Sequence, residues 1–213
     1  QLFTLKEIET RNAAVIGHSR LGKTALLCGA QYERFRFVIP NDSGCCGVAL
    51  SRGKQGETVR FIKNNFPHWF CKRFWRYAGN TPIPGFREDL KRFGGDGSDW
   101  YHENFEYNNR FESEMPFDQH FLTGVVAPRF LCVGGAVKDT WADPNSEYLC
   151  LCEISRVYEL FGVKGLVHED RFPIPGDTLQ EGRIGFHLRD YGHYLSRYDW
   201  NRYMQFIRAH LDS

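Results

Sequence analysis

The chain has 213 residues, of which 42% are hydrophobic and 15% aromatic, which is enough for one sizeable core without requiring a second domain. Its 27 Lys and Arg residues nearly balance its 26 Asp and Glu residues, so composition favours neither a nucleic-acid partner nor an anionic membrane surface. No apolar run approaches the roughly 20 residues that a membrane-spanning helix requires, and the first residues show no charged and then apolar signal pattern.

The N-terminal part of the sequence predicts a strand, a helix and a second strand. Residues 13–16 are a short apolar run ending at Gly17, which indicates a buried strand that leads into a tight turn. Good helix formers follow at residues 22–31, and residues 35–39 are a second apolar run stopped by Pro40 and a turn cluster. This order is typical of a right-handed parallel crossover in an α/β sheet.

The middle of the chain, residues 44–115, is rich in glycine, aromatic residues and charge. We interpret it as a loop-rich insertion of short helices and loops over the active-site face. A helix over residues 116–126 and a third strand over residues 127–137 are predicted to follow.

The C-terminal part predicts two longer helices. Asp143 is expected to cap a helix that starts with Pro144 and is closed by Gly162. Residues 165–170 and 184–190 are the last strand candidates. The final helix covers residues 199–211, and its predicted apolar face consists of Trp200, Tyr203, Met204, Ile207 and Leu211.

The seven cysteines form no CxxC pair, so the sequence predicts neither a zinc site nor a disulfide framework. We interpret them as small buried thiols, with room for one disulfide.

Residues 17–24, GHSRLGKT, fit two motifs that imply different chemistry. As GxxxxGK[ST] the string is a phosphate-binding P-loop, in which the lysine and the hydroxyl of Thr24 would hold phosphate and magnesium. A P-loop also needs an apolar strand that ends in a metal-binding acid, and Pro40 interrupts the available candidate. Support for a nucleotide-binding module is therefore thin.

The alternative is a nucleophile elbow, in which Ser19 stands on a sharp turn between a strand and a helix. The second glycine, Gly22, follows Ser19 by three positions and not by the two of the usual GxSxG. This fold places an acid after a later strand and a histidine near the C-terminus. Asp139 and His193 satisfy that order, which favours a serine hydrolase.

The string GHSRLGK also resembles the GCSRxGK nucleophile motif of glucuronoyl esterases, carbohydrate esterase family 15. Further segments similar to bacterial members follow in the same order: IPNDSGCCG, RGKQGETV, FPHWF, PFDQHFL, APRFLCV, DTWADP and YGHYLSRYDW. The resemblance extends from about residue 12 to the end. It implies an α/β-hydrolase fold, a three-layer sandwich with a mainly parallel sheet, and it makes the P-loop interpretation a remote alternative.

The resemblance implies a catalytic triad. Ser19 would be the nucleophile, and His193 would take its proton and return it to the leaving alcohol. Family members place the triad acid at one of two positions, and this chain has a carboxylate at both. We prefer Asp139, and Asp42, where fungal relatives have glutamate, is the alternative acid.

The resemblance also implies four supporting residues. The backbone N–H of Arg20 is the expected oxyanion donor. Lys23, Glu57 and Trp141 match positions that contact the sugar in the family, and a carboxylate and an indole suit a carbohydrate site. The competing interpretations are a solvated helix lysine for Lys23, surface charge for Glu57 and loop packing for Trp141.

The expected reaction is hydrolysis of the ester between (4-O-methyl-)glucuronic acid of glucuronoxylan and a lignin alcohol, through an acyl-enzyme and with no cofactor or metal. An acetyl-xylan or other carbohydrate esterase on the same fold is the alternative. The substrate class implies a secreted or periplasmic protein. Because family members are much longer, we expect residues 1–213 to be the C-terminal portion of a single catalytic domain, apparently lacking its N-terminal strands, with the missing part as a partner.

Overall fold

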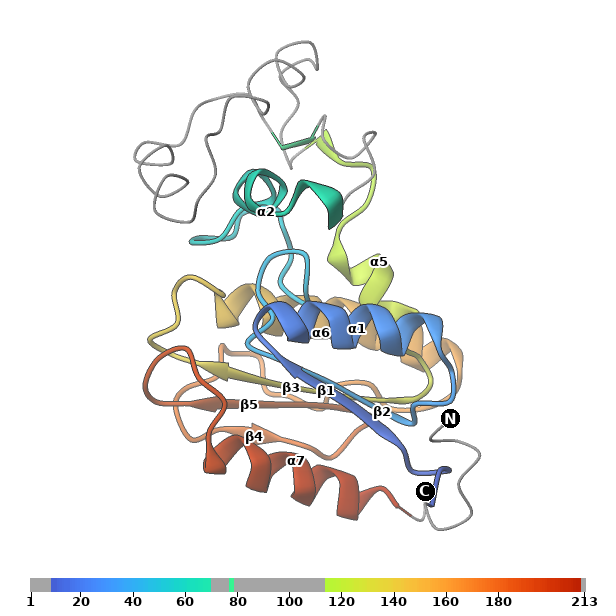
Figure 1. Cartoon of the computed structure of the whole chain (residues 1–213). Coiled ribbons are helices and arrows are strands. Elements are labelled where there is room, and N and C mark those ends of the chain that lie inside the picture. The colour runs from blue at the N-terminus through green and yellow to red at the C-terminus, as the bar shows by residue number, and fades with distance from the viewer. Residues whose placement is uncertain (1–8, 70–76, 79–113, 212–213) are drawn as a thin grey trace. The chain divides into compact units, whose positions relative to one another are not determined.

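The computed structural model describes residues 9–69, 77–78 and 114–211 (Figure 1). The chain divides into two compact units, of which the first joins Gln1–Gly56 to Phe117–Ser213 and the second is Glu57–Pro116. The first unit contains the sheet and the candidate active site. In the second unit the structure describes α2 (Val59–Asn65) and the 3₁₀ helix η2 (Pro67–Trp69).

The first unit is built on a five-stranded sheet with the strand order β1-β2-β3-β5-β4. Its strands are β1 (Ala14–His18), β2 (Phe37–Asn41), β3 (Phe130–Ala136), β4 (Thr178–Leu179) and β5 (Ile184–Arg189). All neighbours pair in parallel except β4, which runs antiparallel to β5. In the described part of the chain, β1 pairs with β2 alone, so its other edge carries no strand.

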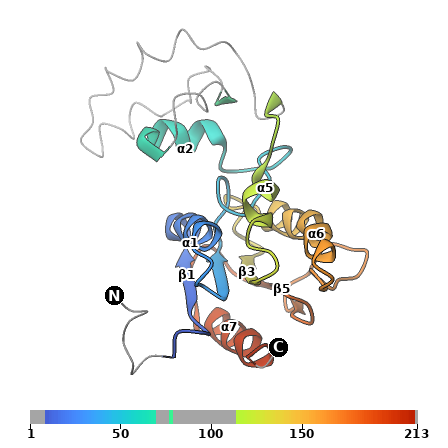
Figure 2. The same cartoon turned by 90° about the vertical axis from the view of Figure 1, so that its right-hand side faces the viewer.

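Helices cover both faces of this sheet, as Figures 1 and 2 show. The helices are α1 (Arg20–Gln31), α5 (Gln119–Gly124), α6 (Pro144–Leu160) and α7 (Arg197–Ala209). Helix α7 lies on one face, and α1 and α6 lie on the other. The α/β class predicted from the sequence is therefore confirmed.

The core has two parts because successive side chains of a strand point to opposite faces. On the side of α1 and α6, Val38 and Leu131 pack with Leu26 and Ile154. On the side of α7, the neighbouring strand residues pack with that helix, and the buried members are Phe37, Ile39, Phe130, Cys132, Tyr203 and Phe206. Both faces of the central strands are buried, which explains their continuous apolar runs.

Helix α6 begins and ends where the sequence predicts. The carboxylate of Asp143 accepts the N–H of Ser146 at 3.3 Å and its hydroxyl at 2.7 Å, and Pro144 is the first helical residue. At the other end Gly162 has a φ of 71°, a left-handed conformation that glycine adopts without steric cost. The predicted cap and stop are both confirmed.

Two predictions for the C-terminal part are wrong. Residues 165–170 form no strand, and a single bridge joins Leu166 to Ile184. The antiparallel edge is instead the two-residue strand β4, which is too short to show a periodic pattern. The apolar face predicted for α7 is wrong only in part. Tyr203 is buried and Ile207 packs against the core, as predicted. Trp200 and Met204 are exposed, and Phe206 is buried in their place.

Residues 44–56 belong to the first unit, although the sequence suggested an insertion over residues 44–115. The N–H of Gly44 donates to a carboxylate of α6 at 2.9 Å, and the N–H of Ser51 donates to Asp118, the cap of α5, at 2.7 Å. These bonds tie the segment to the helices above the sheet. Most of the remaining predicted insertion lies outside the described residues.

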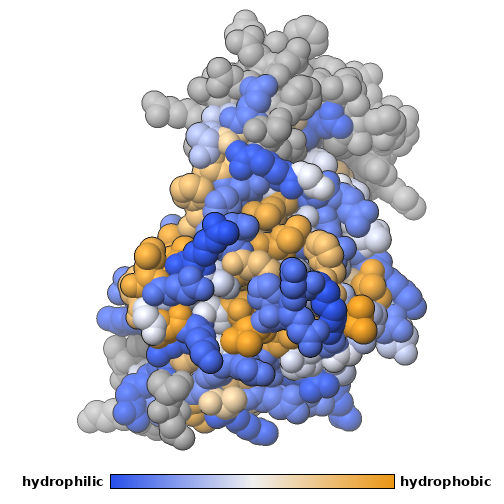
Figure 3. Space-filling view, turned by 180° about the vertical axis from the view of Figure 1, so that it is seen from behind, coloured by the Kyte–Doolittle hydropathy of each residue, from blue (hydrophilic) through white to orange (hydrophobic). Residues whose placement is uncertain are grey.

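Among the described residues, no helix combines the length and the apolar character needed to cross a bilayer. On the face shown in Figure 3, apolar and hydrophilic side chains are interspersed.

Every cysteine in the described ranges is a free thiol, and Cys71 lies outside them.

Candidate active site

The candidate site forms where the parallel strands end. Ser19 follows β1, Asp42 follows β2, Asp139 comes three residues after β3, and His193 lies beyond β5. The carboxyl ends of parallel strands meet at one edge of a sheet, which is where α/β proteins bind ligands. One ligand atom from each of Asp42, Asp139 and His193 lies within 4.8 Å of the others. The fold therefore brings together residues that are up to 151 positions apart.

Ser19 occupies a strained turn between β1 and α1. Its φ of 58° and ψ of −122° are unusual for a residue with a side chain and cost on the order of 1–3 kcal/mol. The turn is fixed by the Ser19 N–H, which donates to the carbonyl of Asn41 at 2.9 Å, and the Ser19 side chain makes no capping bond to α1. The hydroxyl is thus presented by the turn and is not used to start the helix.

Glycines make this turn sterically accessible. A Cβ on Gly17 would lie 2.0 Å from the carbonyl oxygen of Leu21, and a Cβ on Gly22 would lie 2.9 Å from the carbonyl oxygen of Asn41. Neither position can hold a larger residue without moving backbone. The spacing of these glycines, which departs from GxSxG, therefore serves the packing of α1 against the ends of β1 and β2.

Asp139 is the carboxylate that contacts His193. Its Oδ2 lies 2.5 Å from Nδ1 of His193, and its Oδ1 accepts the N–H of Ala142 at 3.1 Å. Burial alone would raise the pKa of Asp139, but the hydrogen bonds from His193 and Ala142 and nearby positive charge lower it below the ordinary 3.8. An ionised Asp139 requires the proton on Nδ1, which leaves Nε2 of His193 free to act as a base.

Asp42 is equally buried but has different partners. Its Oδ2 accepts from Nη2 of Arg189 at 2.9 Å, while its Oδ1 is buried with no hydrogen-bond partner. Burial raises the pKa of Asp42 to about 9, the carboxylate of Glu147 adds to this increase, and the Arg189 guanidinium opposes it. The surroundings of Asp42 therefore favour its protonated form, and those of Asp139 favour its ionised form.

His18 connects the nucleophile turn to His193. Its ring centroid lies 4.6 Å from that of His193, and its Nδ1 lies 2.8 Å from Oδ1 of Asn41. Asn41 is itself held by bonds from its Nδ2 to the carbonyl of Gly134 and to the hydroxyl of Tyr203. Burial lowers the pKa of His18, which favours its neutral form.

Lys23 is directed into the turn that follows Asp42. Its Nζ donates to the carbonyls of Ser43 and Cys45 at 2.6 and 2.7 Å, and the residue is 8% exposed. The interpretation of Lys23 as a solvated helix lysine is therefore wrong. Thr24 is also engaged, because its hydroxyl donates to the carbonyl of Arg20 within α1 at 3.3 Å, so the structure gives the P-loop interpretation no support.

The other predicted site residues lie at different places. Arg20 is the first residue of α1 and is exposed, next to Ser19. Trp141 is 47% exposed and lies two positions after Asp139, in the turn before α6. Glu57 is the first residue of the second unit and is buried.

The sequence analysis missed a buried polar group behind the site. Arg189 and Asp199 are joined by an Nε–Oδ1 bond of 2.9 Å, and Nε2 of His187 lies 2.9 Å from the same oxygen. Two signals were available: an arginine at the end of an otherwise apolar strand, and the SRYD string of residues 196–199. That string forms a capping box at the start of α7.

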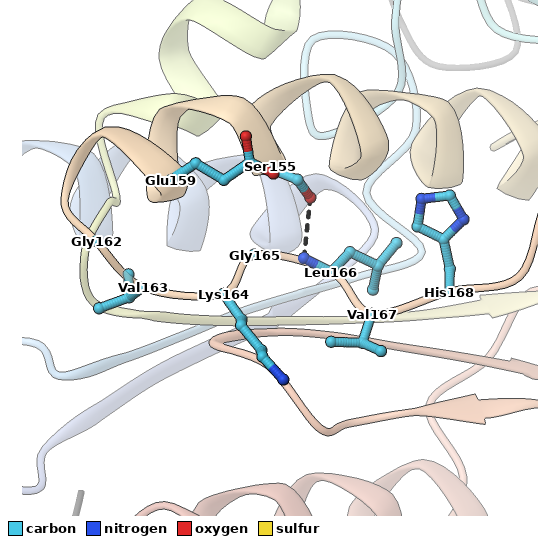
Figure 4. A pocket seen from close by; sticks show the side chains of 9 residues that line it. All are labelled: Ser155, Glu159, Gly162, Val163, Lys164, Gly165, Leu166, Val167 and His168. Atoms are coloured by element: carbon cyan, nitrogen blue, oxygen red, sulfur yellow. Dashed lines mark hydrogen bonds between the residues drawn. The ribbon is translucent and has the colours of Figure 1, made fainter.

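A pocket of about 540 Å³ lies elsewhere, between the C-terminal end of α6 and residues 162–168 (Figure 4). Its Leu166 pairs with Ile184, the first residue of β5, so the pocket lies at the sheet edge opposite to the strand ends described above. The hydroxyl of Ser155 donates to the carbonyl of Leu151 and accepts the N–H of Leu166, both at 2.9 Å. This serine thus has a structural role.

The turn at Ser19 and the Asp139–His193 pair lie at the carboxyl edge of a mostly parallel sheet, which is the arrangement of the α/β-hydrolase fold. Comparison with known proteins gives the family. Residues 2–88 and 87–162 match a family model described as glucuronyl esterase, fungi. The chain belongs to the glucuronoyl esterase family.

Curated and solved relatives agree with this assignment. Carbohydrate esterase MZ0003, from an unknown prokaryotic organism, is 38% identical over 205 residues, which are 96% of this chain and 40% of that protein. A promiscuous CE15 esterase from a marine bacterial metagenome superposes with a TM-score of 0.77 at 37% identity, over 98% of this chain and 44% of that one. A glucuronoyl esterase from Solibacter usitatus superposes with a TM-score of 0.74 at 34% identity, over 98% of this chain and 45% of that one. This chain therefore spans less than half the length of these relatives.

Proposed function

We propose that this chain carries the catalytic triad of an esterase that cleaves the ester between (4-O-methyl-)glucuronic acid of glucuronoxylan and a lignin alcohol. The observation that carries the proposal is the Asp139–His193 bond, in a chain of the glucuronoyl esterase family whose His18, the residue before the Ser19 turn, contacts His193. The proposed triad is Ser19, His193 and Asp139, and Asp42 is not its acid.

The mechanism follows from these groups. Nε2 of His193 takes the proton of the Ser19 hydroxyl while its oxygen attacks the ester carbonyl, and Asp139 stabilises the imidazolium that forms. The backbone N–H of Arg20 is the proposed donor to the oxyanion. His193 then protonates the leaving alcohol, and a water activated by His193 releases the uronic acid from Ser19.

Three further residues are proposed to bind the sugar. Lys23 supports the 43–45 turn beside the site through its two carbonyl bonds, and we propose that its ammonium also faces a uronate hydroxyl. Trp141 is exposed near Asp139, where its indole can cover a ring face. Glu57 is proposed on the strength of the family motif alone.

The test is turnover of a benzyl ester of glucuronic acid by the protein and by its Ser19→Ala variant. We expect the variant to lose on the order of 10⁴-fold or more in kcat, because the acyl-enzyme can no longer form. Ser155→Ala, which changes the serine of the distant pocket, is the matched control and is expected to retain turnover. Equal turnover by wild type and Ser19→Ala would refute the proposed site.

A broader carbohydrate esterase is the second candidate function. It is favoured by the likeness to a relative that is described as a promiscuous CE15 esterase. Hydrolysis of an acetylated xylan at a kcat/KM equal to or above that of the glucuronate ester would support this candidate. A strong preference for the uronate ester would support the first.

We also propose that the outer edge of β1 is paired by a strand from another part of the protein. An unpaired edge beside the nucleophile strand exposes backbone groups that promote aggregation, and in the described residues β1 pairs with β2 alone. An intact, soluble, monomeric and active 24.8 kDa chain would overturn this proposal.

The proposed substrate, a plant cell-wall polymer, implies that the protein is secreted or periplasmic.

A further inference from the structure

Arg189, the last residue of β5, is 4% exposed and has five hydrogen-bond acceptors around its guanidinium. Two of them are carboxyl oxygens of aspartates, and three are backbone carbonyls of the turn that follows the strand. The acceptors are Asp42 Oδ2 at 2.9 Å, Asp199 Oδ1 at 2.9 Å, Asp190 O at 3.3 Å, Gly192 O at 2.8 Å and Tyr194 O in close contact. A buried side chain that satisfies this many groups fixes their relative positions.

Two of the backbone carbonyls that Arg189 binds belong to the neighbours of His193 in the chain. Gly192 and Tyr194 are the residues immediately before and after His193, so the guanidinium holds the backbone on both sides of the proposed base. Cζ of Arg189 also lies 4.3 Å from the centroid of the Tyr194 ring. The planar guanidinium of Arg189 therefore restrains the backbone that carries His193.

The other side of the guanidinium is rigidly anchored. Asp199 Oδ1 receives Nε of Arg189 and contacts Nε2 of His187, while its Oδ2 accepts the N–H and the hydroxyl of Ser196, both at 2.7 Å. The hydrogen bonds from His187 and Ser196 and the Arg189 charge outweigh burial and lower the pKa of Asp199 to about 2. Asp199 thus supplies a permanent counter-charge at the start of α7.

We propose that Arg189 is a positioning residue for the reaction: its guanidinium fork holds the carbonyls on both sides of His193 and so aims the imidazole at Ser19. This rests on the proposed triad but does not depend on which ester is the substrate. Arg189 contacts neither the substrate nor the reacting atoms. Its contribution is the geometry of the base, and a misplacement of about 1 Å can cost roughly 100-fold in rate.

The experiment measures how fast Ser19 reacts with a fluorophosphonate probe. In that reaction the serine oxygen bonds to phosphorus, fluoride leaves, and His193 takes the serine proton, so the rate reports the triad without a sugar. Arg189→Met and Arg189→Lys are compared with wild type, and turnover of the benzyl glucuronate ester supplies kcat and KM. The control is Arg183→Met, which lies just before β5 at the opposite sheet edge and donates to Pro128 O at 2.8 Å.

We expect both Arg189 variants to react on the order of 10–100-fold more slowly, with kcat lowered and KM changed by less than about threefold, because the base and not the sugar site has moved. Arg183→Met should keep the wild-type labelling rate. Lysine preserves the charge but not the planar fork, so full rescue by Arg189→Lys would overturn the proposal.

Loss of the fold must be separated from loss of positioning. All rates are taken on protein whose melting temperature lies above the assay temperature, and the labelled fraction at completion counts the folded molecules. If Arg189→Met does not fold, Arg189→Met combined with Asp199→Asn removes the buried cation and its counter-charge together. A folded variant without Arg189 that labels at the wild-type rate refutes the inference. Absence of labelling in wild type refutes the proposed triad instead.

Discussion

The turns after β2 and β3 each place a buried aspartate near His193, Asp42 in the first and Asp139 in the second. The two aspartates differ in their hydrogen-bond partners and in the charges around them. Asp42 is 2% exposed and Asp139 is 4% exposed, and burial raises the pKa of both carboxyl groups. Asp139 receives hydrogen bonds from His193 and from the N–H of Ala142, and its pKa falls. Asp42 has one unpartnered oxygen and the Glu147 carboxylate nearby, and its pKa rises to about 9.

Hydrogen bonds that favour the ionised form suit a carboxylate to the role of a triad acid, and of these two residues Asp139 has them. The Asp42 turn is instead a support. Ser43 Oγ and the N–H of Gly44 both donate to Glu147 at 2.9 Å, and Lys23 binds two carbonyls of the same turn. We infer that the turn after β2 holds the site together and the turn after β3 takes part in the chemistry.

The largest expected effect tests that division of roles. Asp139→Asn should lower kcat by on the order of 10³–10⁴-fold, because an amide cannot stabilise the imidazolium and favours the wrong tautomer. Asp42→Asn should cost about tenfold or less, since Asp42 is already neutral near pH 7. Both values come from turnover of the benzyl glucuronate ester, with melting temperatures as the control for folding. The reverse ranking would make Asp42 the triad acid.

A smaller effect is expected from the support of the Asp42 turn. Lys23→Met should lower the free energy of unfolding by about 2–4 kcal/mol, because it leaves two buried carbonyls without a donor, at about 1–3 kcal/mol each. Lys164→Met, at an exposed lysine, is the matched control and should change stability by less than about 0.5 kcal/mol. Denaturant titration measures both, and equal effects would show that the carbonyl bonds of Lys23 do not stabilise the turn.

The pH dependence of stability should also separate the two turns. The folded pKa values of Asp42 and Glu147 are raised, to about 9 and about 7, from 3.8 and 4.5. A carboxyl group whose pKa is raised on folding is held in its protonated form by the folded state. Its contribution to stability is complete below the pKa of the unfolded state and is lost as the pH rises through the pKa of the folded state. The free energy of unfolding should therefore fall between about pH 4 and pH 9, by at most about 1.4 kcal/mol per pH unit for each proton.

Glu147→Gln isolates one of these protons. The glutamine has no charge to bury, so the variant should show a flatter fall than wild type between about pH 5 and pH 7. Denaturant titrations at several pH values supply the two curves. Parallel curves would mean that Glu147 does not take up a proton on folding.

The smallest expected effect concerns the turn after β3. Asp143→Ala removes the cap of α6 and should cost about 1 kcal/mol, without the loss of kcat expected for Asp139→Asn four residues earlier. Asn145→Ala, at an exposed position of the same helix turn, is the control. A large fall in kcat in an Asp143→Ala protein that is still folded at the assay temperature would show that the cap also orders the Asp139 turn.

Local sequence signals predicted the parts of the fold that depend on neighbouring residues. The cap at Asp143, the stop at Gly162 and the turn around Ser19 are each encoded within a few positions. The face of α7 was misassigned at two positions, because Trp200 and Met204 fit a helical apolar stripe with Tyr203 as well as Phe206 does. The sheet selects the stripe that also carries Asp199, whose charge is neutralised by a residue ten positions away.

By itself, the sequence determined the α/β class, the strained glycine-flanked turn at Ser19, and the order in which serine, aspartate and histidine follow one another. Which carboxyl contacts His193 was decided by tertiary structure, because Asp42, Asp139 and His193 follow three different strands and meet only when the sheet has formed. The role of Arg189 was decided in the same way. Its five acceptors come from two strand ends and the start of a helix, and no local pattern specifies that they meet around one guanidinium.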